Sequence, residues 1–475
     1  MVASGLRLAA CLVMAAAAAV LAAPPVPRAA MSLLLPSDDP FYRVPDDLNG
    51  TKPGTIISWR LPPKPIAAFG KLAVQLKSTH QILYRTTDSL DHATATVLTV
   101  LVPQGADLDK VLSYQVAEDA ATINCAPSYV FQQDHATGPD HGTEVTELEF
   151  FLVMAALAQK WVVIVPDYLG PKGAFLANRL AGQATLDGIR AAVNSEHITG
   201  IKKGAKVAMW GYSGGSLATL WAAELQPTYA PELKNIVGAA AGGTVPNISS
   251  VIESVNKKSY AGLIAAGIVG LANQYQPLED LLQKHVLPKF KDQFFAPRKQ
   301  CQNANGKQFA NKDIPAMLDD PQLVFQHPLA KKLTKENALG HATPRVPLFI
   351  YKAMKDEVSP EAETDALVRR YCDAGTLVEY RRYGGANHAE LAAMATPRAL
   401  SWLQDSLHGR LQSTKCPPRI TLPSWLFDLD SFRIMPKTFL NVLWDILGVR
   451  DIKEFIQSPL AQSFVSSFTE IVGSS

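Results

Sequence analysis

Apolar residues recur along the chain in two alternating patterns, short continuous runs and longer segments with helical spacing. The short runs are rich in β-branched residues, which is typical of buried strands. The predicted strands span residues 72–84, 94–102, 111–116, 161–166, 207–210, 236–241, 346–351 and 377–380. The predicted helices between them span residues 147–159, 185–195 and 216–225, and the first of these is predicted to be amphipathic. This alternation predicts an α/β fold with a mostly parallel sheet and helices on both faces.

The alternation stops between about residues 245 and 341. Segments 260–273 and 278–290 have helical apolar spacing, and no strand is predicted between them. Because nearly a hundred residues exceed what one crossover helix needs, we predict a helical cap inserted into the sheet domain. Its stretch 261–272 is strongly apolar but shorter than a membrane span, so we expect a buried cap helix or one that lines an apolar tunnel.

Both ends of the chain differ from this body. Residues 1–23 have a basic residue followed by a short apolar run and small residues, which indicates a signal peptide rather than a membrane anchor. Residues 39–63 are proline-rich and are predicted to be irregular. After the core, residues 24–416, the tail 417–475 is rich in large apolar side chains. We expect it to pack on the body as a flap or extension, because such a surface is rarely left exposed.

Composition narrows the class of protein. The chain has 475 residues, 47% of them hydrophobic and 19% charged, and a formal net charge of +2. A large core is therefore expected, and nothing favours nucleic-acid binding.

Secretion changes how the cysteines are interpreted. Cys11 would leave with the signal peptide, whereas Cys125, Cys301, Cys372 and Cys416 would remain in an oxidising compartment, with three pairings open. No cysteine or histidine spacing indicates a metal site, and no cofactor is expected.

Two sequons would permit glycosylation of a secreted chain. They lie at Asn49 and Asn247.

The candidate chemistry centres on Gly211-x-Ser213-x-Gly215. A predicted strand precedes it and a predicted helix follows it. This is the arrangement of the nucleophile elbow at the top of an α/β-hydrolase sheet, where small residues on either side relieve a strained turn. An ordinary glycine-rich turn is the alternative, and the strand and helix around it favour the nucleophile.

A serine nucleophile needs a base and an acid, which follow it in chain order in this fold. His388 lies in a glycine-rich turn after the last predicted strand, where the histidine belongs. Asp356 and Glu357 both follow the preceding strand, and the shorter Asp356 is favoured. Asp373 lies too far along the next helix.

The oxyanion that forms during acyl transfer needs two backbone N–H donors. One is expected from Gly214, directly after the nucleophile. The other should come from the loop after an early strand, and Asp119 is the candidate there, although no His-Gly-Gly-Gly motif is present.

Motifs over most of the chain together resemble the fungal secretory lipase family, of the lipase-A type. The matching segments are Asp39-Pro40-Phe41-Tyr42, Pro53-Gly54-Thr55-Ile56, Ser113-Tyr114-Gln115 with Glu118-Asp119, Cys125-Ala126-Pro127-Ser128-Tyr129, Pro166-Asp167-Tyr168-x-Gly170-Pro171, Ala184-Thr185-Leu186-Asp187-x-Ile189-Arg190, and the elbow with the Asp356 and His388 turns. The resemblance covers about residues 37–416, and the tail departs from it.

The resemblance implies a secreted serine ester hydrolase, with a triacylglycerol lipase as the expected function. It implies the triad Ser213, Asp356 and His388, with oxyanion donors at Asp119 and Gly214. It also implies the disulfides Cys125–Cys301 and Cys372–Cys416. We expect a monomer that acts outside the cell on a lipid or small ester substrate at a lipid–water interface.

Two alternatives remain open at this point. One is an esterase or deacetylase for a small specialised-metabolite ester. The other is a non-catalytic lipid-binding protein on a hydrolase scaffold.

Overall fold

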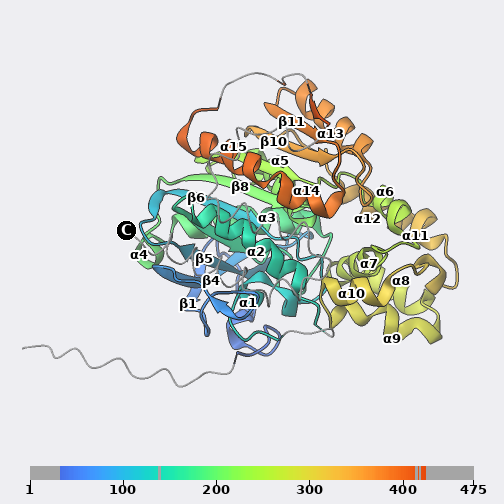
Figure 1. The fold of residues 1–475 in the computed structure, drawn as a ribbon. Coiled ribbons are helices and arrows are strands. Elements are labelled where there is room, and N and C mark those ends of the chain that lie inside the picture. Colours follow the sequence, from blue (N-terminus) through green and yellow to red (C-terminus); the bar gives the residue numbers. More distant parts are fainter. Residues whose placement is uncertain (1–32, 137–140, 412–415, 417–418, 424–475) are drawn as a thin grey trace, which may run out of the picture. The chain divides into compact units, whose positions relative to one another are not determined.

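The structure is a computed structural model that describes residues 33–136, 141–411, 416 and 419–423. The predicted signal peptide and all but a few residues of the tail 417–475 lie outside these ranges. In the described part, ten strands form one sheet in the order β1-β4-β5-β7-β6-β8-β9-β10-β11-β12 (Figure 1). Their bounds are β1 Ile56–Arg60, β4 Ser78–Thr87, β5 Ala93–Val102, β6 Asp107–Gln115, β7 Trp161–Pro166, β8 Lys206–Tyr212, β9 Ile236–Gly242, β10 Leu348–Ala353, β11 Val378–Tyr383 and β12 Ile420–Leu422.

The sheet is mostly parallel, which confirms the predicted α/β class. Every neighbouring pair from β7 to β12 is parallel, and only the pairs among β1, β4, β5 and β7 are antiparallel. The central strands are buried on both faces, as all six residues of β7 show. A parallel strand covered on both faces has no polar side to present, so its sequence is a continuous apolar run.

Helices cover both faces of the sheet. Alternate residues of β8 belong to different cores: Ala208 and Trp210 pack with α2 and α15, whereas Val207 and Met209 pack with α3, α5 and α13. The bounds of the helices outside the cap are α1 Pro127–Val130, α2 Glu144–Leu157, α3 Asn178–Val193, α4 Glu196–Thr199, α5 Gly214–Tyr229, α13 Glu361–Asp373, α14 His388–Met394 and α15 Thr396–His408.

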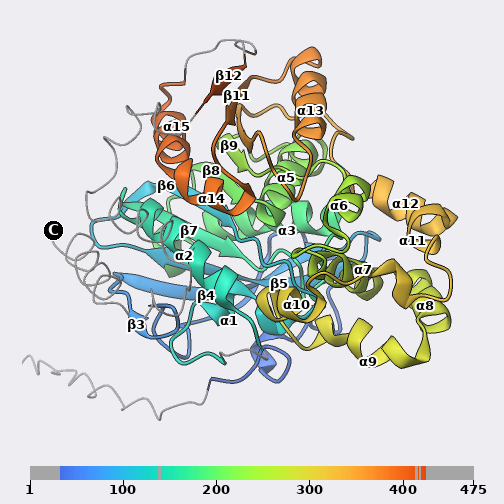
Figure 2. The ribbon, with the colours of Figure 1, turned by 45° about the vertical axis from the view of Figure 1, so that its right-hand side comes forward.

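Between β9 and β10 the described chain is helical and forms a group of its own, drawn in green to orange in Figure 2. The bounds are α6 Ile248–Val255, α7 Gly262–Gln274, α8 Gln276–His285, α9 Lys291–Phe294, α10 Gln302–Phe309, α11 Leu323–Gln326 and α12 Pro328–Glu336. These helices share a separate apolar core that includes Ile264, Phe294 and Phe309.

The two ends of the segment that carries these helices lie next to each other. The N–H of Leu339 donates to the carbonyl oxygen of Pro246 at 3.0 Å. Asn337 then binds Asn178 at the start of α3 through two hydrogen bonds of 2.9 and 2.7 Å. The carboxylate of Glu224 on α5 accepts the backbone N–H groups of residues 340–342.

Three local expectations were wrong. Segment 72–84 is two strands: β3 Leu72–Ala73 pairs with β2 Ala67–Ala68 in a small separate sheet, and β4 starts at Ser78. Strand β1 lies inside the proline-rich segment that was predicted to be irregular. Helix α2 is not amphipathic, because the sheet lies on one side of it and α10 and α15 also pack on it, so both faces are buried.

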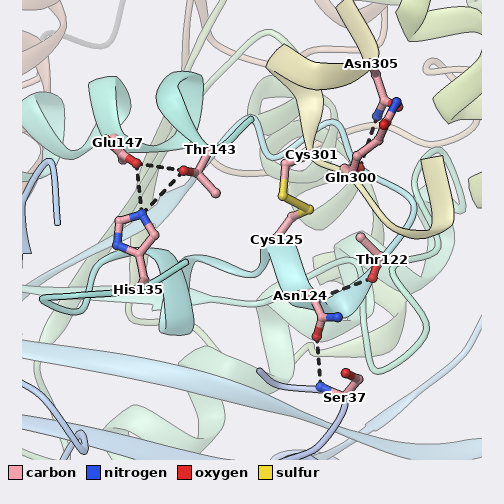
Figure 3. Close-up of a disulfide and its surroundings, with 10 residues drawn as sticks. All are labelled: Ser37, Thr122, Asn124, Cys125, His135, Thr143, Glu147, Gln300, Cys301 and Asn305. Atoms are coloured by element: carbon pink, nitrogen blue, oxygen red, sulfur yellow. Dashed lines mark hydrogen bonds and ion pairs between the residues drawn. A yellow bond between two sulfur atoms is a disulfide. The ribbon is translucent and has the colours of Figure 1, made fainter. Parts of the chain in front are cut away.

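Two disulfides join distant parts of the chain, Cys125–Cys301 and Cys372–Cys416. The first is buried and links the loop after β6 to the start of α10 (Figure 3). The second joins the end of α13 to the segment that leads into β12. A bond that closes a loop as long as the first restricts the unfolded chain strongly.

Candidate active site

Ser213 occupies a sharp turn between β8 and α5. Its φ of 48° is unusual for a residue with a side chain. The glycines on either side are required by space: a Cβ on Gly211 would lie 2.3 Å from the carbonyl oxygen of Gly215, and one on Gly215 would lie 2.0 Å from that of Gln115. The turn therefore holds the hydroxyl group out from the sheet in one direction.

His388 begins α14, and its ring lies between Ser213 and Asp356. Its Nε2 is 2.8 Å from the Ser213 Oγ, and its Nδ1 is 2.7 Å from the Asp356 Oδ2. Its backbone is fixed as well, because its N–H donates to Glu357 at 2.9 Å and its carbonyl oxygen accepts the Tyr212 hydroxyl group. The serine, histidine and acid expected from the sequence thus form one hydrogen-bonded chain.

Asp356 is buried but is held as a carboxylate. Its Oδ1 accepts the N–H groups of Val358 and Ser359, both at 2.9 Å. Its Oδ2 also accepts from Nζ of the buried Lys352 at 2.9 Å. Burial alone would raise the pKa of Asp356, but the His388 hydrogen bond and the charges of His388 and Lys352 outweigh it and lower that pKa well below its usual range.

Asp119 and Gly214 lie against each other beside Ser213. A Cβ on Gly214 would fall 2.0 Å from the Asp119 Oδ1, which shows how close the two residues are. Asp119 has a φ of 44°, and its Oδ1 has no hydrogen-bond partner among the described residues. Burial raises the pKa of Asp119 to about 6, against the opposing charge of His388.

The loop that carries Asp119 is held by three separate contacts. The Ala117 N–H donates to the buried Glu149 at 3.0 Å, and the Tyr168 hydroxyl group donates to the Val116 carbonyl oxygen at 2.6 Å. Asn273 of α7 donates to the Ala121 carbonyl oxygen at 3.0 Å. The position of the loop therefore depends on both the core and the cap.

An apolar cavity runs from Ser213 into the cap. Asp119, Ser213 and Gly214 line its inner end, and α6, α7, α8, α11 and α12 supply most of the wall. Apart from Asp119, Ser213, His285 and Thr334, the lining residues are apolar, for example Ile264, Leu271, Leu278, Leu282 and Val324. Such a surface favours a hydrocarbon chain over a polar group.

Three residues contact His388 or Asp356 in ways that were not predicted from the sequence. Lys352 sits in the otherwise apolar strand β10, and a single charge among buried residues was the available signal. Glu357 was considered only as an alternative acid, whereas in the structure it binds the His388 backbone. Nothing in the sequence pointed to the contact between Tyr212 and His388.

The predicted sequons lie in different surroundings. Asn49 is exposed in a turn. Asn247 is half-buried, and its side chain caps α6 and approaches Glu363 at 3.5 Å. A glycan on Asn247 would displace that contact.

No group of three or more His, Cys, Asp or Glu side chains in the described ranges could hold a metal ion. Among the helices of the same ranges, none is both long and apolar enough to span a bilayer.

A nucleophile elbow on a mostly parallel sheet, with an acid and a histidine on later strand ends, defines an α/β-hydrolase. Residues 136–414 match the family model described as secretory lipase. The chain belongs to this secretory lipase family.

Individual relatives agree with this assignment. The chain is 42% identical to Lipase A of Arthroderma benhamiae over 425 residues, which cover 89% of this chain and 90% of that relative. It is 37% identical to Lipase 5 of Candida albicans, covering 80% and 83% of the two chains. Among solved structures, Candida antarctica lipase A superposes with a TM-score of 0.75 at 29% identity, covering 86% of this chain and 95% of that one.

Proposed function

We propose that this protein is a lipase that hydrolyses fatty acyl esters of glycerol, with Ser213, His388 and Asp356 as its catalytic triad. One observation carries the proposal: a serine hydrogen-bonded to a histidine lies at the inner end of an apolar cavity. The lipase names of the relatives support the same substrate class.

The proposed reaction follows from the positions of the groups. His388 Nε2 removes the Ser213 proton as Oγ attacks the ester carbonyl carbon, and Asp356 stabilises the imidazolium ion that forms. The N–H groups of Asp119 and Gly214 bind the oxyanion. His388 then protonates the leaving alcohol, the acyl chain stays in the apolar cavity, and water releases it by the same steps in a second cycle.

The test is hydrolysis of an ester series from acetyl to oleoyl, in solution and as an emulsion, by the wild type and by Ser213→Ala. We expect activity on long acyl chains and a loss of at least about a thousandfold in the variant. Activity confined to acetyl and other short esters would instead identify a small-ester deacetylase. Equal rates for the two proteins would exclude both enzymatic functions and would favour the non-catalytic lipid-binding protein.

We also propose that the protein acts outside the cell, at a lipid–water interface. The description of its family as secretory and the two disulfides support this location. N-terminal sequencing of protein recovered from culture medium should begin at Pro24, and a sequence that begins at Met1 would exclude the predicted cleavage.

A further inference from the structure

A second cavity adjoins the apolar one at Asp119 and Leu263, which line both. It lies between the starts of α7 and α10 and has a volume of about 310 Å³. The expected position of the oxyanion is therefore the junction of two spaces, and only the first of them is needed for an acyl chain.

The second cavity is on the histidine side of that junction. Tyr260, which lines it, lies near Glu357, because burial and then the charge of Glu357 raise the pKa of its hydroxyl group. Glu357 in turn accepts the backbone N–H of His388 at 2.9 Å. In acyl transfer the leaving alcohol must lie next to the histidine, because the histidine gives it a proton.

The residues that line the second cavity differ in chemistry from those that line the apolar cavity. Gln302 and Asn303 line the second cavity, and their side-chain amides have no partner among the described residues. Lys307 also lines it, but its ammonium group pairs with Glu144 at 3.7 Å. Free amides beside a neutralised cation suit an uncharged group with several hydroxyls, whereas a hydrocarbon would leave the amides without hydrogen bonds.

The start of α10, which carries Gln302 and Asn303, is held firmly in place. Gln302 and Asn303 directly follow Cys301, whose disulfide to Cys125 ties α10 to the segment that follows Asp119 (Figure 3). The Cys301 N–H donates to the His141 carbonyl oxygen, and the Asn303 N–H donates to that of Gly142. A recognition surface held in this way loses little entropy when it binds a ligand.

We propose that this cavity is the alcohol subsite of the enzyme, and that it selects esters whose alcohol carries free hydroxyl groups, such as monoacylglycerols. The inference rests on the proposed lipase function and narrows its substrate class. When the tetrahedral intermediate collapses, the bond between carbon and the alcohol oxygen breaks, and its electron pair stays on that oxygen. The oxygen takes the proton from His388 Nε2, and the acyl group remains bonded to Ser213.

The test compares 1-octanoylglycerol with ethyl octanoate, which share an acyl chain. The proteins are the wild type, the double variant Gln302→Leu/Asn303→Leu, and the control Gln283→Leu, which makes a matched change on the exposed face of α8. We expect the wild type and the control to favour the glycerol ester in kcat/KM by about tenfold, and the double variant to lose that preference while its ethyl ester rate stays within about twofold.

An unchanged ratio in the double variant, with ethyl octanoate hydrolysis that depends on Ser213, would overturn the subsite and leave the lipase proposal intact. No Ser213-dependent hydrolysis of either ester would overturn both. If the double variant does not fold, a second experiment on the wild type alone tests the subsite. The acyl-enzyme is formed from p-nitrophenyl octanoate, and added glycerol should capture its acyl group at a lower concentration than 1-propanol does. Equal capture by the two alcohols would contradict the subsite.

Discussion

Asp119 places a carboxyl group where the proposed reaction develops negative charge. Since burial raises its pKa to about 6, the group is neutral below that pH and a carboxylate above it. The neutral form does not repel the oxyanion, whereas the carboxylate does.

We therefore expect the kcat/KM of Asp119→Asn, divided by that of the wild type, to increase about tenfold as pH rises from 5 to 8. Asparagine tolerates a positive φ, so the backbone N–H should stay in place. The measurement is the pH profile of both proteins on one soluble ester. A ratio that does not change with pH would contradict this role of the carboxyl group.

Lys352 is predicted to act as a positioning residue for the proposed triad. Its ammonium group lies 2.9 Å from Asp356 and 2.8 Å from the carbonyl oxygen of Thr244. Replacing Lys352 by methionine removes the cation that helps keep the pKa of Asp356 low. The loss of ionised Asp356 should then begin at a higher pH, and the acid limb of the activity profile should move upward.

We expect Lys352→Met to lower kcat/KM, and to lower it more at pH 5 than at pH 8. The control is Lys355→Met, a matched change on an exposed side chain three residues away. A parallel loss at every pH would indicate a structural role alone.

At the residue scale, the sequence predicted the candidate triad residues, because they follow a fixed order along the chain in this fold. It did not predict the residues whose role depends on a contact in the folded structure. Ser213 and His388 lie in recognisable turns after strands. The sequence could not assign separate tasks to Asp356 and Glu357, because their tasks depend on which atom of His388 each one reaches. The pairing of Lys352 with Asp356 could not be predicted for the same reason, since the two residues meet across a turn.

At the element scale, Glu224 joins α5 to the end of the cap. Its buried carboxylate accepts the N–H groups of Gly340, His341 and Ala342 and the hydroxyl group of Tyr371. If this carboxylate is removed, four donors lose their acceptor, and the buried hydroxyl group of Tyr371 is left unpaired at a cost in free energy.

Glu224→Ala should therefore lower the free energy of unfolding by about 2–4 kcal/mol. Urea unfolding gives this value, and Glu253→Ala on the exposed side of α6 is the control, with an expected change below about 0.5 kcal/mol. Equal midpoints for the two variants would show that the contact carries no stability.

Elements were predicted well where local sequence decides them. Strand β7 has the predicted bounds, and α5 follows the elbow as expected. Helix α2 was misjudged because its second buried face is made by helices that lie far away in the sequence. Helix α3 starts at Asn178, seven residues before the prediction, because its first residue binds Asn337 of the distant cap segment.

For the whole molecule, buried carboxyl groups should make stability depend on pH. Burial raises the pKa of Glu149 to about 8 and that of Asp167 to about 7. The folded state then binds more protons than the unfolded state between about pH 4 and 8, so the free energy of unfolding should fall as pH rises through this range.

Each such group contributes up to about 1.4 kcal/mol per pH unit. Urea unfolding from pH 4.5 to 8 should show the decline, and Glu149→Gln should make it less steep. Stability that rises steadily with pH, or the same slope in the variant, would count against this assignment.

The general plan of the molecule could be predicted because alternating strands and helices have few ways to pack. The position of Asp119 relative to Gly214 could not be predicted, since it depends at once on contacts from α2, from α7 and from Tyr168 in the loop after β7. The expected flap, residues 417–475, lies outside the described residues except for residues 419–423, which include β12.

The hydrogen bond between Leu339 and Pro246 gives the cap a closed base, since the chain departs from the hydrolase core and returns to it at one point. A segment closed in this way can be exchanged as a cassette if its replacement matches the two neighbouring attachment points and keeps two further contacts to the core, the Cys125–Cys301 disulfide and the Asn273 hydrogen bond to Ala121. Ser213, Asp356 and His388 all lie outside that cassette. Protein engineers could therefore transplant onto this core those caps of related enzymes that preserve these two contacts, and so change which acids are released while Ser213, Asp356 and His388 stay in place.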